Sequence, residues 1–147
     1  MKIVYKSIIE ADTKYIVHQC NCVSQKSAYL AASIFEAFPY ANVYENRFER
    51  HIPGSIKICG NGLDKRFVIN IFGQYYPGKS RYSNDSKNLR LEWFQKCLDE
   101  ILKIEDLESI AFPEGIGCGA AGGNWDKYKE MIENFARQTT ADVVLYS

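Results

Sequence analysis

A glycine-rich segment in the last third of the chain carries the strongest chemical signal in the sequence. This glycine segment, residues 112–125, reads Phe-Pro-Glu-Gly-Ile-Gly-Cys-Gly-Ala-Ala-Gly-Gly-Asn-Trp, with five glycines within nine positions. Without side chains in the way, several backbone N–H groups can turn into one concavity, and a helix predicted to follow adds positive potential. Both features favour a phosphate or pyrophosphate ligand. A flexible turn is the alternative, because the Lys-Ser/Thr pair of a P-loop and the later acidic residue of a dinucleotide fingerprint are absent.

A second polar cluster, His18-Gln19-Cys20-Asn21-Cys22, falls at the end of a predicted strand, where α/β proteins bind ligands. The His18 imidazole can hold or transfer a proton near neutral pH, and the Asn21 amide can donate to and accept from a sugar hydroxyl. His18, Cys20 and Cys22 share one face of the strand. Their spacing supplies no fourth zinc ligand and no CxxC pair, so we expect no metal site. A packed core histidine is the alternative for His18.

The polar segment 75–86 is a third candidate, and it reads Tyr-Tyr-Pro-Gly-Lys-Ser-Arg-Tyr-Ser-Asn-Asp-Ser. Its three tyrosines could stack on a nucleotide, while Lys79 and Arg81 could neutralise phosphate. The residues at 83–86, however, are all good N-caps for the helix predicted to follow. For Asp85, a capping role is favoured over a catalytic one.

Alternating strands and helices must position these segments. Hydrophobic patterns predict strands at residues 2–5, 14–20, 55–59, 66–72, 108–112 and 142–146. They predict helices at residues 28–38, 88–103 and 125–136. Strand 66–72 is apolar on both faces, which is typical of a strand covered on both sides, and Gly60-Asn61-Gly62 indicates a hairpin with the strand before it. The pattern therefore predicts an α/β fold with a mixed central sheet.

Length and composition restrict the class of protein. The chain has 147 residues, 46% hydrophobic and 24% charged, which are values for one globular domain spanning residues 1–147. Lys plus Arg equals Asp plus Glu, 18 each, so we expect no dedicated nucleic-acid surface. No secretory signal or membrane-length apolar run is visible, and an odd count of five cysteines favours reduced thiols. We therefore expect a monomer with no membrane partner, located in the cytoplasm. If the source is a virus or phage, we expect it in the cytoplasm of the host cell.

Taken in order, these motifs resemble the macro domain family. The resemblance rests on the strand end His18-x-Cys20-Asn21, on the strand end Asn70-x-Phe72-Gly73, and on the Pro-x-Gly-Ile-Gly-Cys-Gly run before a helix that begins at Trp125. The chain is most similar to the branch that contains ADP-ribose 1″-phosphate phosphatases and ADP-ribosyl-glutamate hydrolases. The resemblance implies a three-layer α/β/α domain with a mixed central sheet. It also implies a cleft at the strand ends that binds ADP-ribose, or a derivative of it, without a cofactor.

The resemblance further implies roles for single residues. The loop 115–120 would wrap the pyrophosphate and distal ribose, Asn21 and Gly73 would lie near that ribose, and the Tyr146 ring would lie against adenine. His18 matches a histidine suspected of catalysis in the phosphatase branch. The ligand-binding residues expected on this basis are Cys20, Cys22, Ser27, Ala28, Gly73, Gln74, Gly115, Ile116, Gly117, Cys118, Gly119, Ala120 and Tyr146. For a phosphatase, the catalytic residues expected are His18, Asn21 and Asp85, with His18 or Asp85 orienting or activating water.

Departures from the family pattern bear on the activity. Residues 23–28, in the place of a usually glycine-rich phosphate loop, contain no glycine, and Ser7 stands where an acidic residue often contacts adenine. The lysine and aspartate of the hydrolase branch are replaced by Gln74-Tyr75 and Ala120-Ala121. We therefore expect hydrolysis of the terminal phosphate of ADP-ribose 1″-phosphate. The alternatives are removal of ADP-ribose from modified protein or nucleic acid, and binding of ADP-ribose or a related nucleotide signal without turnover.

Overall fold

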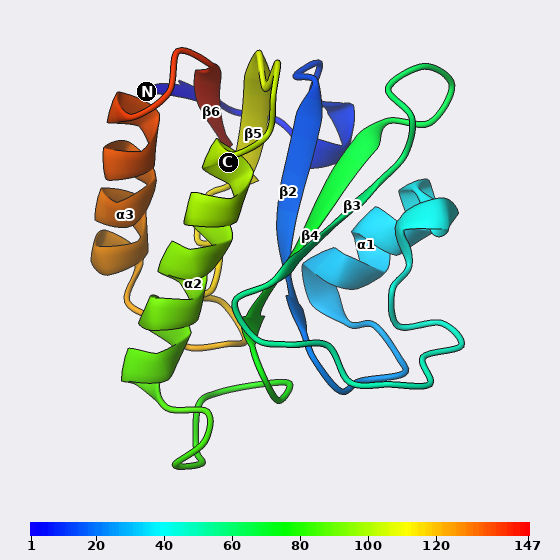
Figure 1. Ribbon diagram of the computed structural model, residues 1–147, viewed down its shortest axis with the longest axis vertical. Helices are drawn as coiled ribbons and strands as arrows, with labels where there is room; N and C mark the ends of the chain where they lie inside the picture. Colours follow the sequence, from blue (N-terminus) through cyan, green and yellow to red (C-terminus); the bar gives the residue numbers. More distant parts are fainter.

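A six-stranded mixed sheet forms the centre of the protein in the computed structural model, which describes residues 1–147 (Figure 1). The strands lie in the spatial order β1-β6-β5-β2-β4-β3, and all neighbours are parallel except the antiparallel pair β3 and β4. The mixed sheet predicted from the sequence is therefore confirmed. The strands are β1 (Lys2–Val4), β2 (Tyr15–Asn21), β3 (Ile56–Cys59), β4 (Phe67–Gln74), β5 (Ser109–Pro113) and β6 (Asp142–Tyr146).

Helices cover both faces of the sheet. Helices α2 (Lys87–Leu102) and α3 (Trp125–Arg137) lie side by side on one face, where Phe94 and Phe135 pack into a common core cluster (Figure 1). Helix α1 (Tyr29–Ala37) covers the opposite face, where Phe35 packs into a second cluster. The arrangement is the three-layer α/β/α fold expected from the sequence. None of the helices has the length and apolar character needed to cross a lipid bilayer.

Strand β4 shows why this sequence forms a central strand. Ile69 and Ile71 pack into the cluster under α2 and α3, whereas Val68 and Phe72 pack into the cluster under α1. Because side chains alternate between the two faces and both faces are covered, the strand is apolar almost throughout. The neighbouring strand β2 begins in the same way, but its second half is polar.

The helix and strand bounds follow their sequence signals closely. Helix α1 ends before Pro39, which begins a short 3₁₀ turn (Pro39–Ala41), and a second 3₁₀ turn (Ile8–Glu10) follows β1. The connection between β3 and β4 contains Gly60 and Gly62 at φ values of +103° and +75°, left-handed values that glycine adopts readily. Strand β4 continues two residues beyond its predicted end, to Gln74. This extension brings the Gln74 side chain to the edge of the sheet described next.

The carboxyl ends of β5, β2 and β4 lie next to one another at one edge of the sheet, because these three neighbouring strands are parallel. The chain leaves β5 through the glycine segment, β2 through residues 22–28, and β4 through the polar segment 75–86. All three candidate segments of the sequence therefore meet at this edge. In α/β folds this is the position at which ligands bind.

Candidate functional site

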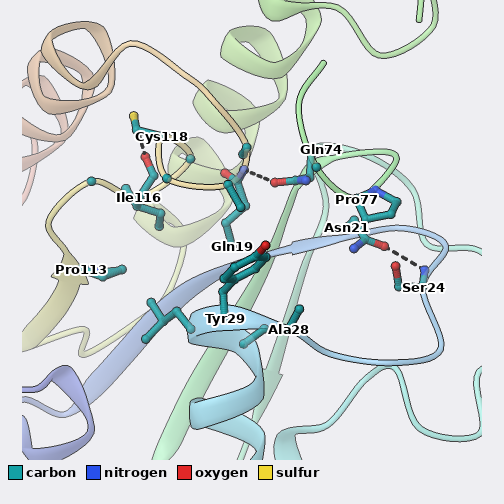
Figure 2. A pocket seen from close by; sticks show the side chains of 18 of the residues that line it. Gln19, Asn21, Ser24, Ala28, Tyr29, Gln74, Pro77, Pro113, Ile116 and Cys118 are labelled. Carbon is teal, nitrogen blue, oxygen red and sulfur yellow. Dashed lines mark hydrogen bonds between the residues drawn. The ribbon is translucent and has the colours of Figure 1, made fainter. Parts of the chain in front are cut away.

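A cleft of about 340 Å³ opens at this edge of the sheet (Figure 2). One wall is the start of α1 with the segment leading into it, where Ser24, Lys26 and residues 28–31 line the cleft. Residues 113–121 of the glycine segment form the opposite wall, and Gln19, Asn21 and Gln74 lie between the two. The volume lies within the range of small-molecule sites, about 300–1,000 Å³.

The glycine segment forms a tight loop with free backbone donors at the cleft. Gly115 and Gly117 have φ values of +80° and +76°. A Cβ atom at Gly117 would lie 2.7 Å from the Tyr128 ring, so this position also needs the space that glycine leaves. The N–H groups at positions 115, 117, 119, 120 and 121 make no hydrogen bond within the chain. These five donors are available to an acceptor in the cleft.

The facing wall offers a second set of free donors, at the N-terminus of α1. The N-cap residue is Ala28, which has no side chain that could cap the helix, and the N–H groups of Tyr29, Leu30 and Ala31 make no hydrogen bond. All four residues line the cleft. Because an uncapped helix N-terminus carries partial positive charge, this wall also favours an anion.

Tyr29 holds an unusual backbone conformation at this wall. Its φ is +55°, in the left-handed region, and the residue is 79% exposed. Figure 2 shows its ring reaching toward Gln19 across the cleft. Such a conformation costs a residue other than glycine about 1–2 kcal/mol. The surrounding structure therefore holds Tyr29 in a strained conformation, and the small surface that Tyr29 buries does not offset this cost.

Two glutamines between the walls form a short hydrogen-bonded chain. Gln19 Nε2 donates to Gln74 Oε1 at 2.7 Å, and Gln74 Nε2 donates to the backbone carbonyl of Tyr76 at 2.9 Å. Because a carbonyl can only accept, the Tyr76 oxygen sets the orientation of both amides. Gln19 Oε1 is left buried without a partner.

Strand β2 directs its polar residues to opposite faces. Gln19 and Asn21 line the cleft, whereas His18, Cys20 and Cys22 are buried on the face that α1 covers. The shared face of these last three residues was predicted, but it is not the face of the cleft. Sequence reasoning overlooked Gln19 as a site residue, although alternation along the strand places it beside Asn21.

His18 is a core residue in the structure. Its side chain is fully buried, packs edge-on against Phe35 of α1, and donates from Nε2 to Asn70 Oδ1 at 2.5 Å. Burial lowers the pKa of His18 to about 4, although the hydrogen bond with Asn70 acts in the opposite direction. The imidazole is therefore neutral at pH 7 and does not line the cleft. The structure does not bring this expected catalytic residue to the site, and its surroundings are those of a packed core histidine.

Asp85 also lies outside the cleft, because its carboxylate is held by a buried ion pair. Arg90 Nε and Nη2 donate to Asp85 Oδ1 and Oδ2 at 2.8 and 2.7 Å, and the Tyr76 N–H donates to Oδ2 at 3.0 Å. Burial alone would raise the pKa of Asp85, but these hydrogen bonds outweigh it and hold the pKa below its ordinary value. The N-cap of α2 is the next residue, Ser86, whose Oγ accepts from the Leu89 N–H. Asp85 is therefore neither the cap nor a group within reach of the cleft.

Asn21 is the one expected catalytic residue that lines the cleft. Its Oδ1 accepts from the N–H groups of Val23 and Ser24 at 3.1 and 2.8 Å, which holds the turn that leaves β2 (Figure 2). Its Nδ2 makes no hydrogen bond within the chain, so this amide can donate to a ligand. The expected ligand-binding residues that line the cleft are Ala28, Gln74, Gly115, Ile116, Gly117, Cys118, Gly119 and Ala120.

The other expected ligand-binding residues do not line the cleft. Cys20 and Cys22 are buried under α1, and Ser27 lies between lining residues without contributing to the surface. Gly73 makes room for the site indirectly, because a Cβ atom there would clash with Gln19 Oε1. Tyr146 is buried in the cluster under α1, and its carbonyl accepts from the N–H of Glu114 at 2.8 Å.

Backbone dipoles, more than charged side chains, give the cleft its electrostatic character. Among the residues that line the cleft, only Lys26 and Glu114 carry a charged side chain, and their charges are opposite. Burial raises the pKa of Cys118 to about 11, so this thiol is neutral at pH 7. No group of three or more His, Cys, Asp or Glu side chains is arranged to hold a metal ion.

Comparison with solved structures identifies the fold as that of macrodomains, although no family model and no curated protein matches the chain. The macrodomain of Mycobacterium tuberculosis DarG is 22% identical, with 98% of this chain and 96% of that chain covered and a TM-score of 0.70. The macrodomain of Thermus aquaticus DarG is 22% identical, with 99% and 95% covered and a TM-score of 0.73. Thermosipho africanus DarTG in complex with ADP-ribose is 13% identical, with 98% of this chain and 40% of that chain covered and a TM-score of 0.74.

Proposed function

We propose that the cleft binds ADP-ribose. The observation that carries this proposal is the pair of facing donor sets, one in the glycine segment and one at the uncapped N-terminus of α1. A diphosphate between the two walls can accept hydrogen bonds from both, and the partial positive charge of both favours it. Further support comes from DarTG, which shares this fold and was solved in complex with ADP-ribose.

The polar groups between the walls suit the ribose of such a ligand. Asn21 Nδ2 is a free donor, and the Gln19 side chain lines the cleft between the same walls. A ribose hydroxyl can accept a hydrogen bond from the Asn21 amide. A ligand with both a diphosphate and a second ribose therefore uses more of the cleft than a nucleoside monophosphate does.

Binding is the function that the geometry supports best, and turnover is a separate proposal. Hydrolysis of ADP-ribose 1″-phosphate needs a group in the cleft that positions or activates water. Of the residues expected for this role, Asn21 lines the cleft, whereas His18 and Asp85 do not. Release of phosphate from ADP-ribose 1″-phosphate by the unmodified chain, and its loss in Asn21→Ala, would extend the proposal from binding to catalysis.

Calorimetric titration with ADP-ribose, ADP and AMP tests the binding proposal. We expect ADP-ribose to bind more tightly than AMP, because AMP cannot span both donor sets. The discriminating variant is Gly119→Ile. Gly119 has no left-handed φ, and a Cβ atom there meets nothing within 4 Å, so the larger side chain fits the fold but occupies the cleft. We expect Kd to rise about 100-fold, equal to about 2.7 kcal/mol.

Gly119→Ala is the matched control for this substitution. Its single methyl group should weaken binding less than isoleucine does, and neither variant should lower the temperature of thermal unfolding appreciably. Absence of heat with ADP-ribose at millimolar concentration would refute the proposed function. Unchanged affinity in Gly119→Ile would show that the glycine segment is only a turn.

A further inference from the structure

The Arg90 side chain lies behind the cleft and uses all of its donors. It belongs to the first turn of α2 and is 3% exposed. Besides its two bonds to Asp85, Nη1 donates to the backbone carbonyls of Gly78 at 2.8 Å and Ala121 at 3.3 Å. Nη2 also donates to the carbonyl of Tyr76 at 3.3 Å. A guanidinium has five N–H groups, and each of them here has an acceptor.

Two of these carbonyls belong to residues that line the cleft, and the two residues come from different loops. Gly78 lies between β4 and α2, whereas Ala121 lies in the glycine segment between β5 and α3. Both oxygens accept from Arg90, which does not line the cleft. They are therefore directed away from the cleft. A carbonyl oxygen turned inward would repel a phosphate at close range. Arg90 therefore keeps the negative ends of two peptide groups away from an anionic ligand.

The same network reaches the polar groups inside the cleft. The Tyr76 carbonyl accepts from Gln74 Nε2 as well as from Arg90, and Gln74 in turn accepts from Gln19. The Tyr76 N–H donates to Asp85, so both sides of this residue's backbone are held. One buried guanidinium is thus connected to both loops and to the orientation of both glutamines.

We propose that Arg90, held by Asp85, is a positioning residue that keeps both loops in the conformation that accepts an anionic ligand. The inference rests on the proposed function for the identity of that ligand. Asp85 compensates the charge of Arg90, so Arg90 acts through geometry and not through direct attraction. Lysine would keep the positive charge but would offer three donors from a single atom, without the planar fork that reaches all these acceptors.

The variant Arg90→Lys tests this role. If the loops are correctly placed only about a tenth of the time in the variant, Kd for ADP-ribose rises about tenfold. The matched control is Ile132→Ala, because Ile132 is fully buried in α3, away from the cleft, and its truncation lowers stability without touching the network. Unchanged affinity in Arg90→Lys, or an equal loss in both variants, would overturn the positioning role.

A second measurement needs no ligand. The N–H groups of Cys118, Gly122 and Gly123 bond within the glycine segment, so their hydrogen exchange reports how firmly this loop is held. We expect exchange about tenfold faster in Arg90→Lys than in Ile132→Ala. If the unmodified chain fails to bind ADP-ribose while exchange changes as expected, the proposed function fails and the positioning role stands. Unchanged exchange overturns the positioning role by itself.

The double variant Asp85→Leu/Arg90→Met serves if Arg90→Lys does not fold. Replacing a buried ion pair by apolar side chains of similar size often preserves stability. The carbonyls of Gly78 and Ala121 lose their donor in this variant, so we expect the same loss of affinity and faster exchange. Affinity equal to that of the unmodified chain would overturn the proposal. Failure of both variants to fold would also overturn it, because Arg90 would then serve the folding of the whole domain.

Discussion

At the scale of single residues, His18 makes the stability of the protein depend on pH. Burial is the main cause that lowers its pKa from 6.5 to about 4. Between these pH values the unfolded chain binds a proton that the folded chain does not, so the free energy of unfolding falls as the pH falls. We expect a loss of about 2 kcal/mol between about pH 7.5 and about pH 5, measured by urea denaturation.

The variant His18→Gln isolates this contribution. The pKa of His51 is also lowered, chiefly by burial, and acts on stability in the same direction. The free energy of unfolding of the variant should therefore still depend on pH through His51, but the part of the dependence that comes from His18 should disappear. An NMR titration in which the His18 imidazole protonates near pH 6.5 would contradict the expectation, as would an unchanged pH dependence in His18→Gln.

The Tyr29 side chain should contribute nothing to the stability of the protein. Its backbone is left-handed and the residue is 79% exposed, so Tyr29→Gly removes strain and little packing. We expect the free energy of unfolding to stay the same or to rise by about 1 kcal/mol. The matched control is the next residue of α1, where Leu30→Gly should cost about 1 kcal/mol. Equal losses in the two variants, measured by urea denaturation, would contradict this account.

At the scale of elements, two adjacent residues at the start of α2 have different roles: Ser86 caps the helix and Asp85 forms an ion pair with Arg90. Ser86→Ala removes one hydrogen bond to the Leu89 N–H and should cost about 1 kcal/mol. Asp85→Ala leaves Arg90 buried without its partner and should cost about 3–5 kcal/mol. Urea denaturation of both variants checks the order. A loss in Ser86→Ala as large as that in Asp85→Ala would contradict the roles assigned here.

The elements were predictable because their signals are local. The alternation of Ile69 and Ile71 with Val68 and Phe72 needs only the period of a strand, and Pro39 ends α1 by its own ring geometry. The cleft wall at residues 115–120 was predictable for a similar reason. Glycines between a strand and a helix free the backbone N–H groups wherever the rest of the chain lies.

The partners of the polar side chains were not predictable, because they depend on how the elements and loops pack together. His18 and Gln19 are neighbours in β2, and only the position of α1 decides which of them is buried and which lines the cleft. Asp85 precedes a helix and looks like a cap by its type alone. Its pairing with Arg90 depends on how the 75–86 segment folds back over α2, which no local pattern encodes.

At the scale of the whole molecule, the balance of charge predicts a weak effect of salt on ligand binding. Lys plus Arg equals Asp plus Glu, 18 each, and the cleft contains one side chain of each sign, Lys26 and Glu114. The other donors in the cleft are backbone N–H groups, which carry only partial charges, so added salt removes less of their attraction for a phosphate than it would at lysines or arginines. We expect the affinity for ADP-ribose to change less than about fivefold between about 0.05 and about 0.5 M NaCl, measured by calorimetry. A steep decline would indicate that lysines or arginines hold the phosphates instead.

The pairing of β1 with β6 joins the two ends of the chain in space. Lys2, Ile3 and Val4 stand in register with the last strand, and the N–H of Ser147 donates to the carbonyl of Val4 at 2.9 Å. During synthesis β1 has no neighbour in the sheet until β6 leaves the ribosome, so this edge forms last. A short linker could join the two ends, and new ends could be opened at the exposed β3–β4 connection around Leu63. In such a circular permutant, β1 and β6 would be made one after the other, and the edge would form early.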